Sequence, residues 1–128
     1  MNRFLRFCAV GSAGFLIDAG ILQVLVAGAN ANPYAARIIS FLMAASGTWL
    51  MNRYYTFEVS LKPTPAEWSR YVAFMVLGGV VNYGVFALCL VFWTRAQESP
   101  WLGVAFGSIA SLGVNFTTSR LLFDKKFK

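Results

Sequence analysis

Four long apolar runs alternate with short polar segments along this chain. The runs extend approximately over residues 5–27, 34–51, 69–92 and 101–119. Each is close to the ~20 residues that an α-helix needs to cross the hydrocarbon core of a bilayer. Because only helices and closed barrels satisfy their backbone hydrogen bonds in lipid, the pattern predicts an all-α integral membrane protein with four transmembrane helices. We expect one transmembrane domain over residues 1–128.

The composition agrees with a membrane location. Of 128 residues, 58% are hydrophobic and only 12% are charged, which leaves too little polar surface to cover a soluble globule of this size. Three further apolar runs follow the first, so the first run is not expected to be a cleaved signal peptide. The chain has no histidine and no cluster with metal-ligand spacing, so we expect neither a metal nor a cofactor. Cys8 and Cys89 fall at opposite ends of their runs and should be free thiols.

The basic residues are distributed unevenly between the two ends of the predicted bundle. Nine of the 11 Lys and Arg residues fall at the end that holds both termini and the middle polar segment. They are Arg3, Arg6, Arg53, Lys62, Arg70, Arg120, Lys125, Lys126 and Lys128, whereas Arg37 and Arg95 fall at the other end. The positive-inside rule therefore predicts cytoplasmic N- and C-termini. The net charge of +6 reflects this placement and does not indicate binding of nucleic acid.

The chain contains an internal repeat, in which residues 6–20 and 70–84 align in register. The matched pairs are Arg6/Arg70, Phe7/Tyr71, Ala9/Ala73, Gly14/Gly78, Asp18/Asn82 and Gly20/Gly84. Both halves would cross the membrane outward and return. This predicts two helical hairpins in a parallel repeat, related by a pseudo-two-fold axis along the membrane normal. Asp18 and Asn82 should then lie at equivalent depths.

Asp18 and Arg37 are ionisable residues within predicted spans, where charges are expensive and are by default functional candidates. Asp18 lies in the outer half of the first span and Arg37 about one turn into the second, so the two side chains are within reach of each other. They could form a structural clamp between the helices. Alternatively, Arg37 could bind an anionic phosphate while Asp18 orients it, or Asp18 could titrate so that proton and substrate compete for it. Asn82 keeps the polarity of this position in the second half without the charge.

Four arginines flank the predicted spans on the cytoplasmic side, among several aromatic residues. They are Arg6, Arg53, Arg70 and Arg120. Flanking arginines and an aromatic belt are ordinary features of the interfaces of a multi-span protein. Because the repeat relates them in pairs, they could instead surround a phosphate or diphosphate headgroup at the inner leaflet. The sequence leaves both interpretations open.

Small residues recur along the spans, among them Gly11, Gly14, Gly78 and Gly107. They allow helices to approach closely within the chain or between copies. Because four short helices bury little surface by themselves, we expect a homo-oligomer. No nucleophile has a base beside it, and no phosphate-binding loop or dinucleotide fingerprint is present, so the sequence does not indicate an enzyme.

Four motifs are spread over nearly the whole chain. They are Phe-Leu-Arg-Phe-Cys-Ala-Val-Gly-Ser-Ala-Gly-Phe-Leu-Ile-Asp at residues 4–18, Ala-Arg-Ile-Ile-Ser at 36–40, Asn-Arg-Tyr-Tyr-Thr-Phe at 52–57 and Asn-Phe-Thr-Thr-Ser-Arg at 115–120. Together they resemble the GtrA-like family, small four-span bacterial membrane proteins related to a regulatory subunit of dolichyl-phosphate mannose synthase. The chain departs from the family pattern at Thr48, where asparagine is common, and in a shortened ending of the second half.

The resemblance implies a protein that handles polyprenyl-phosphate-linked sugars. Such a protein would flip undecaprenyl-phosphate glucose or a similar glycolipid across the bacterial plasma (inner) membrane for surface polysaccharide synthesis or modification, beside a membrane glycosyltransferase. The long apolar tail would stay among the membrane lipids. The ligand-binding candidates are an outer station of Asp18, Arg37 and Asn82, an inner station of Arg6, Arg53, Arg70 and Arg120, and Asn115 in the fourth motif.

Two other functions fit the same sequence. The chain could be an accessory membrane subunit that anchors a polyprenyl-phosphate glycosyltransferase and transports nothing itself. It could also be a small proton-coupled multidrug exporter that uses Asp18, since such exporters likewise have four short spans with one acid in the first. The many arginines, and Arg37 in particular, disfavour the exporter because they repel cations and would neutralise Asp18.

Overall fold

The structure, a computed structural model, describes residues 1–124. The elements in chain order are α1 (Arg3–Gln23), the π-helical turn η1 (Val24–Gly28), α2 (Pro33–Met51), the π-helical turn η2 (Asn52–Thr56), α3 (Pro65–Phe92), α4 (Thr94–Glu98) and α5 (Trp101–Asp124). Over the described residues the chain is helical throughout apart from short connections, which confirms the all-α prediction. The three lysines assigned to the cytoplasmic tail, Lys125, Lys126 and Lys128, lie outside the described residues.

Side chains of the polar segments cap the starts of α2 and α3. Asn32 accepts hydrogen bonds from two backbone N–H groups in the first turn of α2, directly before Pro33. Thr64 accepts a hydrogen bond of 3.1 Å from the backbone N–H of Glu67, again directly before a proline, Pro65. A proline at this position loses no hydrogen bond, and its fixed φ suits the first turn. The helix α3 therefore starts ahead of its apolar run, and its polar first turn faces the end of α2.

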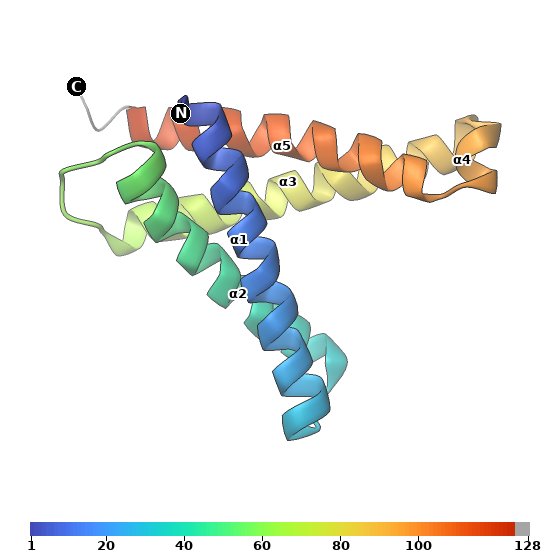
Figure 1. The fold of residues 1–128 in the computed structure, drawn as a ribbon, viewed down its shortest axis with the longest axis horizontal. Helices are drawn as coiled ribbons and strands as arrows, with labels where there is room; N and C mark the ends of the chain where they lie inside the picture. The colour runs from blue at the N-terminus through green and yellow to red at the C-terminus, as the bar shows by residue number, and fades with distance from the viewer. Residues whose placement is uncertain (125–128) are drawn as a thin grey trace.

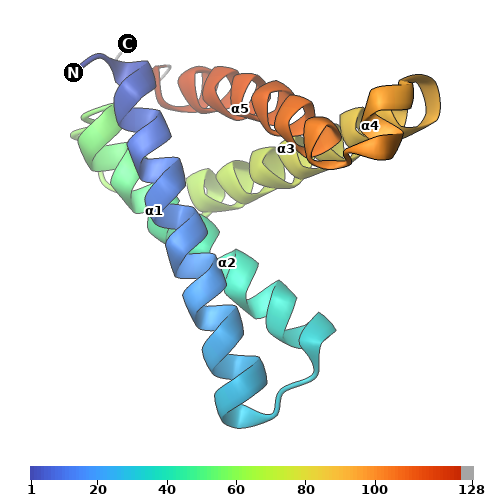
Figure 2. The same cartoon turned by 45° about the vertical axis from the view of Figure 1, so that its right-hand side comes forward.

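The long helices pair into two hairpins (Figure 1). α1 packs along α2, and α3 packs along α5. The start of α1, the segment between α2 and α3, and the end of α5 lie together at what we call the shared end (Figure 2). There, Arg3 Nη1 lies 2.9 Å from Asp124 Oδ1. Both hairpins thus start from the same end, as a parallel repeat requires, while the orientation of that end in a membrane stays a prediction.

The sequence predicted a bundle of the four helices, whereas in the structure the two hairpins diverge away from the shared end (Figures 1 and 2). An apolar cluster joins them at the shared end, made of Phe7, Phe57, Val59, Tyr71, Leu122 and Phe123. The ring of Phe116 packs edge-on against Phe7, with centroids 5.4 Å apart. Beyond this cluster the two hairpins are separated by a cavity and by grooves lined by Phe41, Met75 and Leu112 among other residues, so less apolar surface is buried there to hold the hairpins together.

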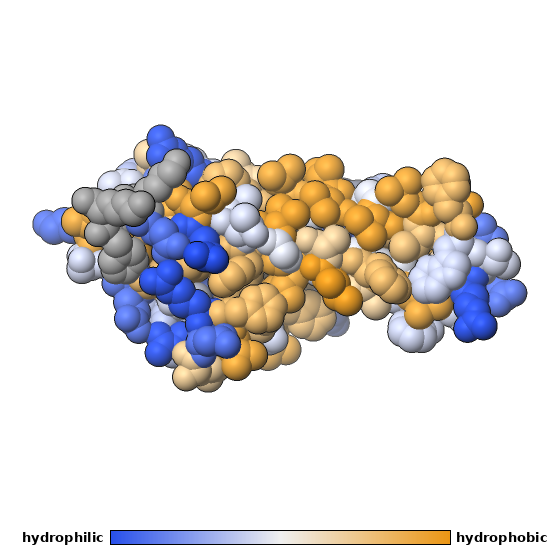
Figure 3. Space-filling view, turned by 90° about the horizontal axis from the view of Figure 1, so that it is seen from above, coloured by the Kyte–Doolittle hydropathy of each residue, from blue (hydrophilic) through white to orange (hydrophobic). Residues whose placement is uncertain are grey.

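Large apolar side chains are exposed on the surfaces of the hairpins, with Val24, Leu88, Val91 and Ile109 among them. Figure 3 shows this apolar surface between polar groups gathered at the two ends of the molecule. Such a surface suits hydrocarbon and not water. Among the described helical segments, two, Arg3–Gly28 and Pro65–Phe92, are each long and apolar enough to cross a membrane by themselves. Spans formed by α2 and α5 stay predictions.

Candidate functional site

A cavity of about 410 Å³, which we call the central cavity, lies between the two hairpins. Each long helix of the described chain contributes one charged or amide side chain that the sequence singled out as a ligand-binding candidate. These are Asp18 from α1, Arg37 from α2, Asn82 from α3 and Asn115 from α5. The structure therefore brings the three residues of the predicted outer station to one cavity, together with Asn115.

Asp18 and Arg37 form an ion pair across the first hairpin. Arg37 Nη1 donates to Asp18 Oδ2 over 2.5 Å. The carboxylate is mostly buried, with 18% of its side chain exposed, whereas 57% of the Arg37 side chain is exposed. A guanidinium has five N–H donors, so Arg37 can hold Asp18 and a second acceptor at the same time. The pair confirms that the two residues are within reach of each other.

Two acceptor atoms of the central cavity have no hydrogen-bond partner among residues 1–124. They are Asp18 Oδ1 and Asn115 Oδ1, and both are buried. A buried acceptor without a donor costs about 1–3 kcal/mol. Asn115 Oδ1 packs against Gly78 of α3, whereas a small rearrangement of Asp18 would present its second oxygen to a ligand with O–H or N–H donors, such as the hydroxyl groups of a sugar. The guanidinium of Arg37 fits an acidic group of the same ligand.

Glycines on the opposite helix make room for the two asparagines. A Cβ atom at Gly78 of α3 would lie 1.8 Å from Asn115 Oδ1 of α5. A Cβ atom at Gly107 of α5 would lie 2.6 Å from Asn82 Oδ1 of α3. Each amide thus occupies space that a larger residue would fill, and α3 and α5 approach closely.

The first hairpin repeats this arrangement with a smaller polar residue. A Cβ atom at Gly14 would lie 2.4 Å from the methyl group of Thr48, just as Gly78 faces Asn115 in the second hairpin. The repeat therefore extends into the second helix of each hairpin, and Thr48 is the counterpart of Asn115. Five residues further on, Arg53 is then the counterpart of Arg120.

Gly107→Ala is expected to destabilise the second hairpin, because the new Cβ would lie 2.5 Å from the backbone carbonyl oxygen of Asn82, which cannot rotate away. Overpacking of this kind costs about 1–3 kcal/mol. Gly113→Ala on the same helix is the matched control, since nothing lies within 4 Å of its Cβ, and it should stabilise the helix by up to about 1 kcal/mol. Unfolding by SDS in mixed micelles, followed by tryptophan fluorescence, measures both variants. Equal stabilities would contradict the close approach at Gly107.

Five polar residues of the central cavity were not among the candidates from the sequence. They are Thr48, Asn52, Tyr71, Ser108 and Ser111. Asn52 Nδ2 donates to Tyr71 Oη over 2.9 Å, and Tyr71 Oη donates to Thr48 Oγ1 over 3.2 Å, which links α2 and η2 to α3 beside the cavity. The spacing of these polar residues along the sequence could have indicated that they share a helix face. Thr48 and Asn52 are four residues apart, as are Ser111 and Asn115, which places each pair on one helix face.

Arg53 lies outside the central cavity, in the packing between α2 and α3. The exposed fractions of the Arg53 and Glu67 side chains are both 0%, and Arg53 Nε lies 3.0 Å from Glu67 Oε1. Arg53 also donates to the backbone oxygens of Val59, over 3.3 Å, and Leu61. Trp49 Nε1 donates to Glu67 Oε1 over 2.9 Å. These contacts fasten the end of the first hairpin to the start of the second.

The other arginines of the predicted inner station also lie outside the central cavity. Arg6 Nη1 lies 2.6 Å from Glu58 Oε1, and Arg120 Nε lies 3.5 Å from Asp124 Oδ2. Arg70 is exposed on α3. Arg6 thus pairs with Glu58 near the shared end, and Arg120 shares Asp124 with Arg3. Of the two predicted stations, the structure assembles the outer one around a cavity.

Fold and site together define a helical membrane domain with a charged and amide-lined cavity between two hairpins. The family model described as GtrA/DPMS, transmembrane domain, matches residues 6–123, so the chain belongs to this family. The match confirms the resemblance carried by the four motifs and connects this membrane protein with polysaccharide and glycolipid processes. No solved structure matches the chain.

Proposed function

We propose that this protein binds a polyprenyl-phosphate-linked sugar in the central cavity and carries its headgroup across the bacterial plasma membrane. The observation that carries the proposal is the Asp18–Arg37 ion pair in a cavity whose opposite wall holds the neutral amides of Asn82 and Asn115. Arg37 binds the phosphate. The free oxygen of Asp18 and the two amides bind hydroxyl groups of the sugar.

A polar headgroup cannot cross hydrocarbon unaided, because each unpaired polar group costs several kcal/mol there and a charge costs more. The central cavity provides substitutes for water in the form of one cation, one carboxylate and several amides and hydroxyls. Groups from both hairpins line it, so a change in the angle between the hairpins would expose the headgroup to one side or the other. The protein acts as a carrier and performs no bond chemistry in this proposal.

The same site distinguishes the proposed carrier from two other roles, a multidrug exporter and an accessory subunit. In a multidrug exporter, a cation would have to displace Arg37 from Asp18, and the 2.5 Å contact between them opposes that exchange. In an accessory subunit, the chain would anchor a membrane glycosyltransferase, and the central cavity would need no ligand. We propose that the glycosyltransferase is a partner that makes or uses the carried lipid, and that the protein works as a homo-oligomer.

Transport into sealed vesicles tests the function directly. The probe is a water-soluble analogue of the lipid with a short prenyl chain, a phosphate and radiolabelled glucose. Vesicles that contain the purified protein are expected to take up this analogue faster than protein-free vesicles, and to take up glucose 1-phosphate no faster. Absence of uptake, together with stimulation of the partner glycosyltransferase in detergent, would favour the accessory subunit.

A further inference from the structure

Two lateral grooves open from the central cavity toward the outside of the molecule. The α2/α3 groove, of about 750 Å³, shares lining residues with the cavity, namely Arg37, Phe41, Met75 and Gly79. The α1/α5 groove, of about 620 Å³, also shares residues with it, namely Gly11, Phe15, Ser108 and Leu112. A ligand whose headgroup sits in the cavity therefore has two ways to extend into lipid.

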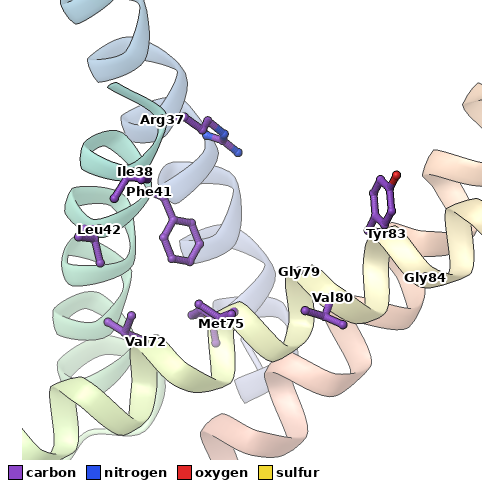
Figure 4. Close-up of a pocket in the computed structure, with 11 residues that line it drawn as sticks. Arg37, Ile38, Phe41, Leu42, Val72, Met75, Gly79, Val80, Tyr83 and Gly84 are labelled. Carbon is purple, nitrogen blue, oxygen red and sulfur yellow. The ribbon is translucent and has the colours of Figure 1, made fainter. Parts of the chain in front are cut away.

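The two grooves differ in charge. The α2/α3 groove is apolar along its length apart from the guanidinium of Arg37 and the hydroxyl of Tyr83. Figure 4 shows Arg37 and Tyr83 on the two helices where these are far apart, and Val72 and Met75 where they are close. Its surface thus changes from a cation at the wide end to hydrocarbon at the narrow end. The α1/α5 groove has no charged residue in its lining.

We propose that the α2/α3 groove holds the hydrocarbon chain of the polyprenyl-phosphate sugar while its phosphate binds Arg37. This inference rests on the proposed function and adds the route that the hydrocarbon chain of the lipid takes. A lipid phosphate carries its negative charge next to the start of a long apolar chain, which matches the order of the groups along this groove. The hydrocarbon chain of the lipid runs from Arg37 toward Val72. The central cavity is then available to the sugar.

A second copy of the protein matches the groove less well. A helix seated there would have to place an acceptor next to the N–H groups of Arg37 that Asp18 does not use, or leave them against apolar side chains. The chain has five acidic residues. Asp18 already pairs with Arg37, and Glu67 is buried against Arg53. The other three lie in connecting segments or at helix ends, namely Glu58, Glu98 and Asp124.

Filling the groove tests the inference. Val80 lies in the α2/α3 groove but not in the central cavity, and its side chain is exposed. Val80→Trp should lower the amount of undecaprenyl phosphate that stays bound in native mass spectra at least about tenfold, because the indole takes the place of several methylene contacts. Val76→Trp provides a second variant in the same groove, since Val76 also lies in the groove and outside the central cavity, and its side chain is exposed. Both variants should lose less affinity for the short-chain analogue than for undecaprenyl phosphate, because fewer methylene groups of the analogue enter the groove.

Matched controls use the same kind of substitution elsewhere. Leu88→Trp changes an exposed apolar residue of α3 outside the groove, and Leu16→Trp fills the α1/α5 groove. Neither should reduce binding of undecaprenyl phosphate. A loss in Leu16→Trp instead of Val80→Trp would place the chain in the other groove, and an equal loss of phosphatidylglycerol would make the groove a general lipid site. Either result overturns the inference, whereas failure of the wild type to bind the short-chain analogue overturns the proposed function itself.

Discussion

Arg53→Ala is expected to destabilise the protein by about 3–5 kcal/mol, because it removes one partner of a buried ion pair and leaves a carboxylate without its charge partner. Arg120→Ala, its counterpart in the repeat, should change the stability by less than about 1 kcal/mol. The difference follows from burial. The Arg53 and Glu67 side chains are both 0% exposed, whereas 57% of the Arg120 side chain is exposed.

SDS unfolding of the two variants beside the wild type measures this difference. Replacing both partners of the buried pair with apolar residues, as in Arg53→Met/Glu67→Leu, should recover part of the loss, since no unpaired charge is left. The backbone oxygens of Val59 and Leu61 still lose their donor, so recovery should be incomplete. The assignment is wrong if Arg53→Ala is as stable as Arg120→Ala.

Arg37→Gln is expected to reduce uptake of the short-chain analogue by about 10- to 150-fold. Hydrogen bonds to charged groups contribute about 1.5–3 kcal/mol, which corresponds to this range of affinity. Glutamine keeps a polar side chain of moderate length but cannot neutralise a phosphate. Arg95→Gln is the control, because Arg95 is an exposed arginine in α4 and does not line the central cavity.

A double variant separates two of the three roles that the sequence left open for this pair, the structural clamp and the phosphate site. In Arg37→Gln alone, Asp18 keeps its charge without a partner, and a loss of uptake could reflect damage to the fold. Asp18→Asn/Arg37→Gln removes both charges and leaves two neutral amide side chains in their place. If Arg37 binds the phosphate, the double variant should fold as the wild type does and still fail to transport. Full transport by the double variant would make the ion pair a structural clamp.

The fold was predictable where it depends on patterns within each helix. The apolar runs gave the four long helices of the described chain, and the match of residues 6–20 with 70–84 gave two hairpins that start from one end. The divergence of the hairpins was not predictable. It depends on how side chains from different helices pack at the shared end, where Phe57 and Val59 of the connecting segment enter the apolar cluster.

The candidate site was likewise predictable only in part from the sequence. Asp18 and Arg37 could be paired from the sequence because a tight connection forces the helices that carry them into an antiparallel hairpin. Arg53 has the sequence context of an arginine at a membrane interface, and the burial of its partner Glu67 depends on the path of the intervening segment. Asn115 was a candidate because it lies in one of the family motifs. Its place in the cavity follows from the close approach to Gly78, which no local pattern reveals.

The neutrality of the Asp18–Arg37 pair bears on how voltage would act on the proposed transport. Without a lipid, the two charges cancel, so a change of conformation moves no net charge through the membrane. A bound phosphodiester adds one negative charge. Moving that charge through the membrane potential changes the free energy by about 2.3 kcal/mol per 100 mV. A membrane that is negative inside would therefore drive the loaded protein outward and let the unloaded protein return freely, without a coupling ion.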